Sequence, residues 1–423
     1  MSTEDRSRAR RAVAAAVVGN VLEWYDFAVY VYMATIIAKK FFPASDEVTS
    51  LLSTFAAFGI GFVMRPLGGI LIGRLGDTRG RKTALLVTIA LMAAGTVLIG
   101  VIPSYESIGV AAPALVVFAR LVQGFSAGGE WGGSTTFIVE WAPEGRRGFY
   151  GSLQQSSVAG GLLLGSAIAA LLNTMVPPET LENWAWRIPF LLGGLLGPVG
   201  LYMRRNIEET PAFARAAEMP SSENVSPSIA PLRLAMRALG FTILWTVAYY
   251  IILSYMPTFL QKYVKLSRTQ ALWSTSAGLL VLVVATPLMG LLSDRIGRKP
   301  LLLAACAGFV LLPYPLFVLM LSGVSLATIV VVQVVLALTI ALYSGPGPAA
   351  IAEIFPTKAR STWMSTGYSA GVAIFGGFAP FIATWLIART GNPISPSYYV
   401  IAAAVASMAV ILGLEETARQ PLR

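Results

Sequence analysis

The chain has 423 residues, of which 56% are hydrophobic and 12% are charged, and its formal net charge is +10. Soluble domains carry about 25% charged residues, so this composition excludes a soluble protein and indicates a chain that lies mostly in lipid. The basic residues are spread over short polar segments, which membrane topology explains without nucleic acid. We therefore expect membrane lipid around the protein and no nucleic-acid partner.

Twelve apolar stretches of about 20 residues, long enough to cross a hydrocarbon core, follow one another along the chain. The first six are expected at about 12–38, 48–73, 83–102, 110–141, 149–175 and 185–203. The second six are expected at about 235–261, 270–292, 300–322, 326–352, 361–388 and 396–414. The predicted fold is all-α and integral to the membrane, with twelve transmembrane helices in two six-helix bundles. The expected domains are residues 1–203 and 235–423, joined by a cytoplasmic linker at 204–234.

The basic residues also predict the orientation of the chain. Most of the 31 Lys and Arg residues lie in the N-terminus, the even-numbered loops and the C-terminus. Cytoplasmic loops are enriched in these residues, so both termini are expected in the cytoplasm. The arginines from Arg6 to Arg11 imitate a secretory signal, but the apolar run that follows is long and contains Glu23 and Asp26. We expect an uncleaved first span.

One loop motif occurs at equivalent places in the two halves. Residues Gly73–Lys82 read GRLGDTRGRK after the second span, and residues Gly290–Lys299 read GLLSDRIGRK after the eighth. The triplet Glu208–Thr210 recurs in the same order as Glu415–Thr417. Such a parallel repeat indicates two halves that can rock about a shared central site, as alternating-access transport requires.

We interpret the repeated motif as a conformational latch. Its glycines permit a tight turn and close helix contact, and its acidic residue can lie at a helix N-terminus and pair with Arg. The alternative is a simple topological anchor. The candidate latch residues are Gly73, Asp77, Arg81, Gly290, Asp294, Arg295 and Arg298.

Ionisable side chains deep in a span are costly and are therefore functional candidates. Asp26 and Arg120 are expected at compatible depths, where each would stabilise the charge of the other, and protonation of Asp26 would release Arg120 to another anion. We expect Glu23 and Glu130, near mid-bilayer, to take part in proton loading; the alternative is hydrogen bonding to backbone. For Arg65 we favour snorkelling or local bracing. The chain has no His, so proton coupling must use carboxylates.

Polar side chains in the same spans are suited to a small polar solute. The candidate substrate-binding residues are Arg120, Gln123, Tyr30, Gln154, Gln155, Tyr250 and Tyr343. Each amide or tyrosine could instead be an interhelical contact. Cys306 is the single cysteine, and no nucleophile is paired with a base, so we expect no enzyme, no metal and no cofactor.

These features together resemble the major facilitator superfamily, through the repeated loop motif, the Arg120-x-x-Gln123-Gly124 stretch and the six-plus-six layout. Five short stretches more narrowly resemble its metabolite:proton symporter family. They are GNVLEWYDF at 19–27, RPLGG at 65–69, QGFSAGGE at 123–130, WRIPF at 186–190 and EETP at 208–211. In related proton-coupled sugar carriers a span 1 aspartate pairs with a span 4 arginine, which the resemblance places on Asp26 and Arg120.

The resemblance implies a proton-coupled importer of the bacterial inner membrane. The family takes citrate, other di- and tricarboxylates, 2-oxoglutarate, shikimate, or zwitterions such as proline and betaine. Two features depart from it: Thr78 replaces the usual Arg of the first loop motif, and the chain ends soon after its last span, whereas osmosensory members carry a long charged tail. Both the superfamily and the duplicated latch favour a carrier over a channel.

We favour a symporter for an organic anion such as citrate or another di- or tricarboxylate. Arg120 can bind a carboxylate bidentately, and protons on Glu23 and Glu130 would reduce repulsion of an anion. The alternative is a zwitterionic osmolyte or shikimate. An aromatic cluster could surround a quaternary ammonium by cation–π contact. The residues of this cluster are Tyr30, Trp131, Tyr249 and Tyr250.

Overall fold

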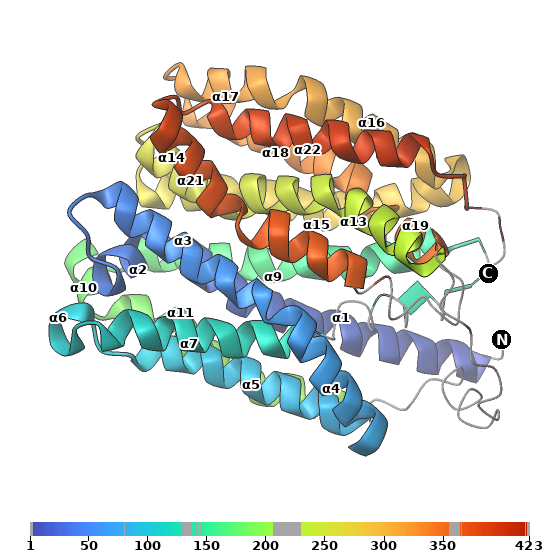
Figure 1. Ribbon diagram of the computed structural model, residues 1–423, viewed down its shortest axis with the longest axis horizontal. Helices are drawn as coiled ribbons and strands as arrows, with labels where there is room; N and C mark the ends of the chain where they lie inside the picture. The colour runs from blue at the N-terminus through green and yellow to red at the C-terminus, as the bar shows by residue number, and fades with distance from the viewer. Residues whose placement is uncertain are drawn as a thin grey trace.

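The computed structural model describes residues 3–79, 81–128, 135, 138–139, 142–143, 145–205, 230–354, 364, 366–418 and 420. Within these ranges the side chains of 3–16, 73, 76–79, 81–82, 84–85, 196, 199–205 and 230–234 are not described. The described chain is helical throughout and contains no strand (Figure 1). The predicted all-α fold is therefore confirmed.

The first half of the chain forms a bundle of long helices with short helices at the turns. Its elements are α1 (Thr3–Tyr32), α2 (Ala34–Phe41), α3 (Glu47–Val63), α4 (Arg65–Arg79), α5 (Arg81–Val101), α6 (Tyr105–Ile108), α7 (Ala111–Ser126), α9 (Arg147–Met175), α10 (Pro178–Asn183), the 3₁₀ helix η1 (Ala185–Arg187) and α11 (Ile188–Arg205). Asp46 begins α3 as its N-cap, since its side chain accepts the Thr49 backbone N–H at 2.9 Å.

The second half repeats this layout. Its elements are α13 (Ala230–Ala248), the π-helix η2 (Tyr249–Tyr255), α14 (Met256–Lys262), α15 (Arg268–Ile296), α16 (Arg298–Leu311), α17 (Pro313–Leu321), α18 (Leu326–Ser344), α19 (Gly347–Ile354), the π-helix η3 (Val372–Gly377), α21 (Ala379–Thr390) and α22 (Ser395–Leu412). A complete capping box starts α15, where Ser267 and Gln270 bond each other's backbone N–H.

The helices agree with the expected spans. Among the described residues, 7 helices are long and apolar enough to cross a membrane, or up to 9 if each bent pair is one span. Two expected spans are broken: α1 and α2 meet at 62°, and α16 and α17 meet at 43°. The second bend falls where Pro313 cannot donate a backbone hydrogen bond. Most of the linker expected at 204–234 lies outside the described residues, so the domain boundaries stay a prediction.

The two halves lie side by side with their long helices running in similar directions (Figure 1). Helix α1 begins at the same end of the molecule at which the chain finishes, which we call the terminal end. The opposite end, which carries α6, α10 and α14, is the distal end. The halves meet most extensively along α9 and α15, where the Ser166 and Ser276 hydroxyls are 2.8 Å apart.

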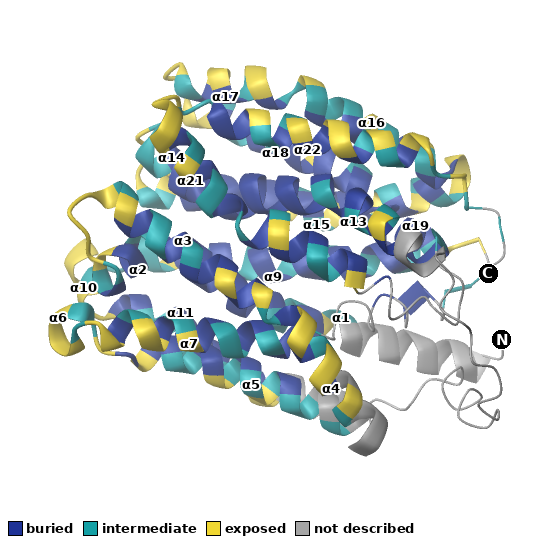
Figure 2. Ribbon diagram, viewed as in Figure 1, coloured by how far each residue is buried: buried dark blue, intermediate teal, exposed yellow. Residues whose placement is uncertain are grey.

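Apolar side chains point outward as well as inward, as a lipid environment requires. Buried residues follow the helix faces that turn toward one another, and exposed residues follow the outer faces (Figure 2). Leu280, Val284 and Leu288 form one stripe of α15 at four-residue spacing, and each is more than half exposed. A soluble protein rarely exposes such a stripe, so this face of α15 is a lipid-facing surface.

Candidate functional site

Arg120 lies in the middle of the first bundle and is fully buried. Its guanidinium donates to the Gln123 side-chain oxygen at 2.8 Å and to the Phe58 backbone carbonyl at 3.3 Å. The rings of Phe27, Tyr30 and Phe58 surround its guanidinium carbon at centroid distances of 5.1, 4.8 and 4.7 Å. Hydrogen bonds and ring faces thus compensate for part of the desolvation of this cation.

The direct ion pair expected between Asp26 and Arg120 is not formed, although both side chains belong to the described part of the chain. Gln123 and Thr96 lie between them instead. Gln123 follows Arg120 by three residues on α7, so it lies on the same face, and its amide donates to the Thr96 hydroxyl at 2.8 Å. Asp26 lies beside Thr96 at Gly193, and the Thr96 hydroxyl itself donates to the Met92 backbone carbonyl at 3.1 Å. A chain of polar groups therefore links the predicted partners: Asp26, Thr96, Gln123 and Arg120.

Asp26 is enclosed by tight helix packing. The residue is 6% exposed, and one carboxylate oxygen, Oδ1, has no hydrogen-bond partner among the described residues. A Cβ at Gly193 of α11 would come within 2.5 Å of this oxygen. The glycine therefore allows α11 to approach the carboxylate.

A cavity opens between the two halves, beside this polar chain. The space between its walls amounts to about 280 Å³ when the adjoining open solvent is included. Residues from α1, α9, α13, η2 and the helical segment before η3 line it, namely Trp24, Gln155, Val158, Trp245, Thr246, Tyr249, Tyr250 and Tyr368. Two Trp and three Tyr therefore form much of its wall, and these eight lining residues include no Asp, Glu, Lys or Arg.

Several polar atoms at the cavity lack partners. Gln155 Oε1, Thr246 Oγ1, Tyr249 Oη and Tyr250 Oη are buried and have no hydrogen-bond partner in the described part of the chain. Leaving a buried polar group unpaired costs about 1–3 kcal/mol, so these four groups are available to hydrogen-bond a polar solute or water in the cavity.

Two π-helices shape this wall. Tyr249 and Tyr250 belong to η2, which interrupts the span that continues from α13 into α14. On the facing element η3, a Cβ at Gly376 would lie 2.8 Å from the Tyr250 ring and would overlap the Thr246 hydroxyl. Short π-helical segments frequently occur at functional sites because they re-aim side chains. The sequence carried no signal from which we predicted either segment.

The predicted substrate-binding residues separate into two groups. Gln155 and Tyr250 line the cavity, whereas Arg120 and Gln123 lie in the polar chain beside it. Tyr30 faces Arg120 and donates to the Thr54 carbonyl at 3.0 Å, so it belongs with the second group.

Two further candidates lie outside the cavity wall. Tyr343 donates to the Phe241 backbone carbonyl at 2.6 Å and packs on Phe241 and Trp245, so its hydroxyl is already satisfied. Gln154 is buried with an unpartnered side-chain amide, but it does not line the cavity.

Of the two glutamates predicted to load protons, the structure describes Glu23 but not Glu130. Glu23 is half-buried, interacts with neighbouring residues, and lies within electrostatic reach of Tyr368 at the cavity. Glu130 and the aromatic candidate Trp131 lie outside the described residues. The roles of both glutamates remain predictions.

Arg65 does not snorkel to the surface. It is only 3% exposed, and its guanidinium carbon lies 4.5 Å from the centroid of Phe62 and 5.3 Å from that of Phe27. The indole of Trp24, a cavity residue, is 5.9 Å away. The snorkelling alternative was wrong, because Arg65 lies on the helix face that packs against the Phe27 and Phe62 rings inside the bundle.

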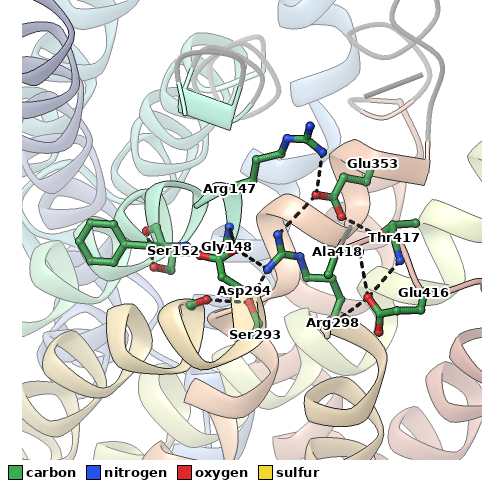
Figure 3. Close-up of polar contacts among 12 residues, drawn as sticks. Arg147, Gly148, Ser152, Ser293, Asp294, Arg298, Glu353, Glu416, Thr417 and Ala418 are labelled. Atoms are coloured by element: carbon green, nitrogen blue, oxygen red, sulfur yellow. Dashed lines mark hydrogen bonds and ion pairs between the residues drawn. The ribbon is translucent and has the colours of Figure 1, made fainter. Parts of the chain in front are cut away.

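The second loop motif joins the two halves at the terminal end (Figure 3). Asp294 accepts the backbone N–H groups of Gly148 and Phe149, at the start of α9, at 2.8 and 3.0 Å. Arg298 donates to Asp294 at 2.7 Å, and both Arg298 and Arg147 lie 3.5 Å from a Glu353 oxygen. These contacts are those a latch between the halves needs.

The structure gives fewer contacts for the remaining latch candidates, which are Gly290, Arg295 and the residues of the first motif. A Cβ at Gly290 would lie 2.6 Å from the Gly148 carbonyl, so this glycine allows α15 to touch α9. Arg295 interacts with neighbouring residues. In the first motif the surroundings of Gly73 and the side chains of Asp77 and Arg81 are not described, whereas Arg74 and Leu75 interact with neighbouring residues.

The segment after α22 docks on the same cluster. Glu416 accepts the Arg298 and Lys299 backbone N–H groups at 2.9 Å, and Thr417 donates to Glu353 (Figure 3). Partial burial raises the pKa of Glu416, but the backbone N–H donors of Arg298, Ala418, Lys299 and Thr417 outweigh it and hold that pKa below its ordinary value. Glu416 therefore caps α16 as a charged carboxylate.

Sequence comparisons agree with this architecture. Residues 12–224 match the family described as sugar (and other) transporter, and residues 238–422 match that described as major facilitator superfamily. The chain belongs to the major facilitator superfamily. A superfamily structure, the xylose transporter XylE from E. coli in a partially occluded inward open conformation, matches with a TM-score of 0.80 at 18% identity, covering 97% of this chain and 99% of that one. This match shows the shared fold.

The curated relatives of the chain include bacterial transporters and a proton symporter. The glycine betaine/proline/ectoine/pipecolic acid transporter OusA of Dickeya dadantii is 35% identical and matches 99% of this chain and 86% of that protein. The proline/betaine transporter of Escherichia coli is 34% identical over the same shares. The citrate-proton symporter of Klebsiella pneumoniae is 38% identical and matches 94% of this chain and 90% of that protein. All three are membrane transporters of bacteria.

Proposed function

We propose that the protein is a proton-coupled symporter that carries a small zwitterion, with an ammonium group and a carboxylate, through the aromatic cavity. The observation that carries the proposal is the set of eight described residues that line the cavity, which comprises five aromatic side chains from both halves and no acidic or basic residue. Ring faces attract an ammonium group, by about 2 kcal/mol or more when the site is desolvated. The names of the Dickeya and Escherichia relatives, which include betaine and proline, support the same class.

The unpartnered polar groups would complete such a site. Hydroxyls of Thr246, Tyr249 and Tyr250 can donate to a carboxylate, and the Gln155 amide can accept or donate.

We assign proton uptake to Asp26. Protonation removes the negative charge of Asp26 beside Thr96. Thr96 accepts a hydrogen bond from Gln123, which in turn accepts one from Arg120. Arg120 also donates to the Phe58 carbonyl. Phe58 belongs to α3, which packs against η3 and α21 of the other half. These successive contacts connect the protonation site at Asp26 with the interface between the halves.

The substrate class is tested by thermal unfolding of the purified protein with betaine, proline, citrate and succinate. A ligand that binds the folded state raises the melting temperature by mass action, and we expect this for betaine or proline. Stabilisation by citrate or succinate alone would contradict the zwitterion proposal.

Proton coupling is tested in proteoliposomes that contain the same protein. An inward proton gradient should drive accumulation of the stabilising solute, and Asp26→Asn should abolish accumulation while exchange of labelled solute persists. Asp46→Asn is the matched control, because Asn caps α3 about as well as Asp. Wild-type protein that fails to exchange labelled solute would contradict a carrier.

An organic anion is the second candidate, and one comparison favours it. The citrate-proton symporter of Klebsiella pneumoniae shares 38% identity with this chain. A carboxylate substrate would need a cationic partner, and among the described residues Arg65 and Arg120 lie buried beside the cavity.

A further inference from the structure

The two buried arginines of the first half differ in how far their donors are satisfied. Arg120 has a side-chain and a backbone acceptor. Arg65 is 97% buried, yet within the described residues its guanidinium has no hydrogen-bond or ion-pair partner, whereas at Arg120 only Nε lacks an acceptor. Its neighbours of known position are the rings of Phe62, Phe27 and Trp24.

Rings alone do not balance a buried guanidinium. Desolvation of a buried ion costs several kcal/mol, and cation–π contacts return about 2 kcal/mol for each desolvated ring, but ring faces leave the guanidinium N–H groups without a conventional hydrogen-bond acceptor. An anion near Arg65 would restore the balance, and a carboxylate fits a guanidinium by paired hydrogen bonds.

The position of Arg65 places such an anion at the cavity. Its guanidinium lies over the Trp24 indole, which lines the cavity. Phe62, the ring nearest Arg65, lies 5.5 Å from the ring of Tyr250. The charge of Arg65 also acts on Tyr250 and Tyr368, both in the cavity wall.

Close helix packing holds the Arg65 backbone in place. A Cβ at Gly128, just after α7, would overlap the Arg65 carbonyl and lie 2.6 Å from the Gly69 nitrogen. The start of α4 therefore cannot shift toward α7, and the side chain points from a fixed backbone.

We infer that Arg65 binds the carboxylate of the transported solute while the aromatic cavity holds its ammonium end. The inference rests on the proposed function, since it assumes that the cavity is the substrate site. It assigns the charge recognition that the lining residues lack: the rings contact the ammonium group, and Arg65, which lies against the Trp24 ring at the edge of the cavity, contacts the carboxylate. Because citrate also carries carboxylates, the same role applies if an organic anion is the substrate.

The test compares glycine betaine with choline, which keeps the trimethylammonium group but has a hydroxyl in place of the carboxylate. Dissociation constants are measured by thermal shift for the wild type, Arg65→Gln and Arg65→Lys. We expect Arg65→Gln to weaken betaine binding about 10–100-fold, the value of a charge-assisted hydrogen bond, and to leave choline binding unchanged. Arg65→Lys keeps the charge without the paired geometry and should fall in between.

Arg389→Gln is the control, because Arg389 is an exposed arginine in the last turn of α21. Equal weakening of betaine and choline binding by Arg65→Gln would show a structural role and overturn the inference, as would unchanged betaine binding. If Arg65→Gln does not fold, Arg65→Lys supplies the same comparison. Wild-type protein that no carboxylate stabilises, in the panel of betaine, proline, citrate and succinate, would overturn the proposed function and the inference together.

Discussion

At the residue scale, glycines decide how closely α7 can approach α3 and α4. A Cβ at Gly124 would overlap the Gly61 carbonyl, and one at Gly68 would overlap the Phe125 carbonyl. This contact between the helices positions Arg120 and Gln123, which lie on the same part of α7. Small residues at such crossings are the usual way in which membrane helices gain close contact.

We predict that Gly124→Ala lowers the free energy of unfolding by about 1–3 kcal/mol, because the new methyl group meets backbone that cannot rotate away. The measurement is the thermal unfolding of purified protein. Gly160→Ala on α9 is the matched control, since its Cβ would meet only Val21 Cγ2, at 3.4 Å. Equal melting temperatures for the two variants would show that α3 and α7 separate at little cost.

At the element scale, α16 depends on a distant residue for its N-terminus. Its N-cap is Gly297, at φ 107°, which offers no side chain to the first turn. Glu416 supplies the acceptor from the segment after α22. The repeated triplet around Glu416 is thus explained in the second half as a helix cap.

We predict that Glu416→Gln destabilises the protein at pH 7 by about 0.5–2 kcal/mol, near the lower end because Glu416 is partly exposed. Its folded pKa is lowered from an ordinary value of 4.5, so its stabilisation is present above pH 4.5 and is lost as the pH falls through the folded value. Melting temperatures of the two proteins should therefore converge in acid. A difference that is constant with pH would contradict a charged cap.

At the scale of the whole molecule, polar contacts join the halves at both ends. At the distal end, Lys262 lies 3.6 Å from Glu47, and Arg268 lies 3.7 Å from Glu182. At the terminal end, Asp294 of one half accepts two backbone N–H groups of the other. Rocking of the halves during alternating access requires such contacts to break and reform.

We predict that Asp294→Ala slows transport without weakening binding. Hydrogen bonds to a charged group contribute about 1.5–3 kcal/mol each, so their loss should shift the balance between conformations by roughly tenfold or more. The initial rate of uptake should fall correspondingly, while the thermal shift with substrate persists because the cavity is unchanged. Glu179→Ala, an exposed acidic residue on α10, serves as control. An uptake rate equal to that of the control would contradict the latch.

The sequence by itself determined the elements and their duplication. Long apolar stretches predicted helices because backbone groups in lipid must bond within their own segment, and helices lie at the expected spans from Glu47–Ile72 to Ser395–Leu412. The two copies of the loop motif predicted two similar halves. The motif's acidic residue was expected at a helix N-terminus, and Asp294 lies at the start of α9.

The tertiary structure alone decided which side chains meet. The similar membrane depths of Asp26 and Arg120 suggested that the two side chains face each other. Depth does not fix the rotation of a helix about its axis, and Gln123 and Thr96 occupy the space between them. Trp245 and Tyr368 were not predicted at the site, because the cavity wall combines helices from both halves. Local patterns record which face of a helix is buried, whereas the packing of separate helices sets which neighbour that face meets.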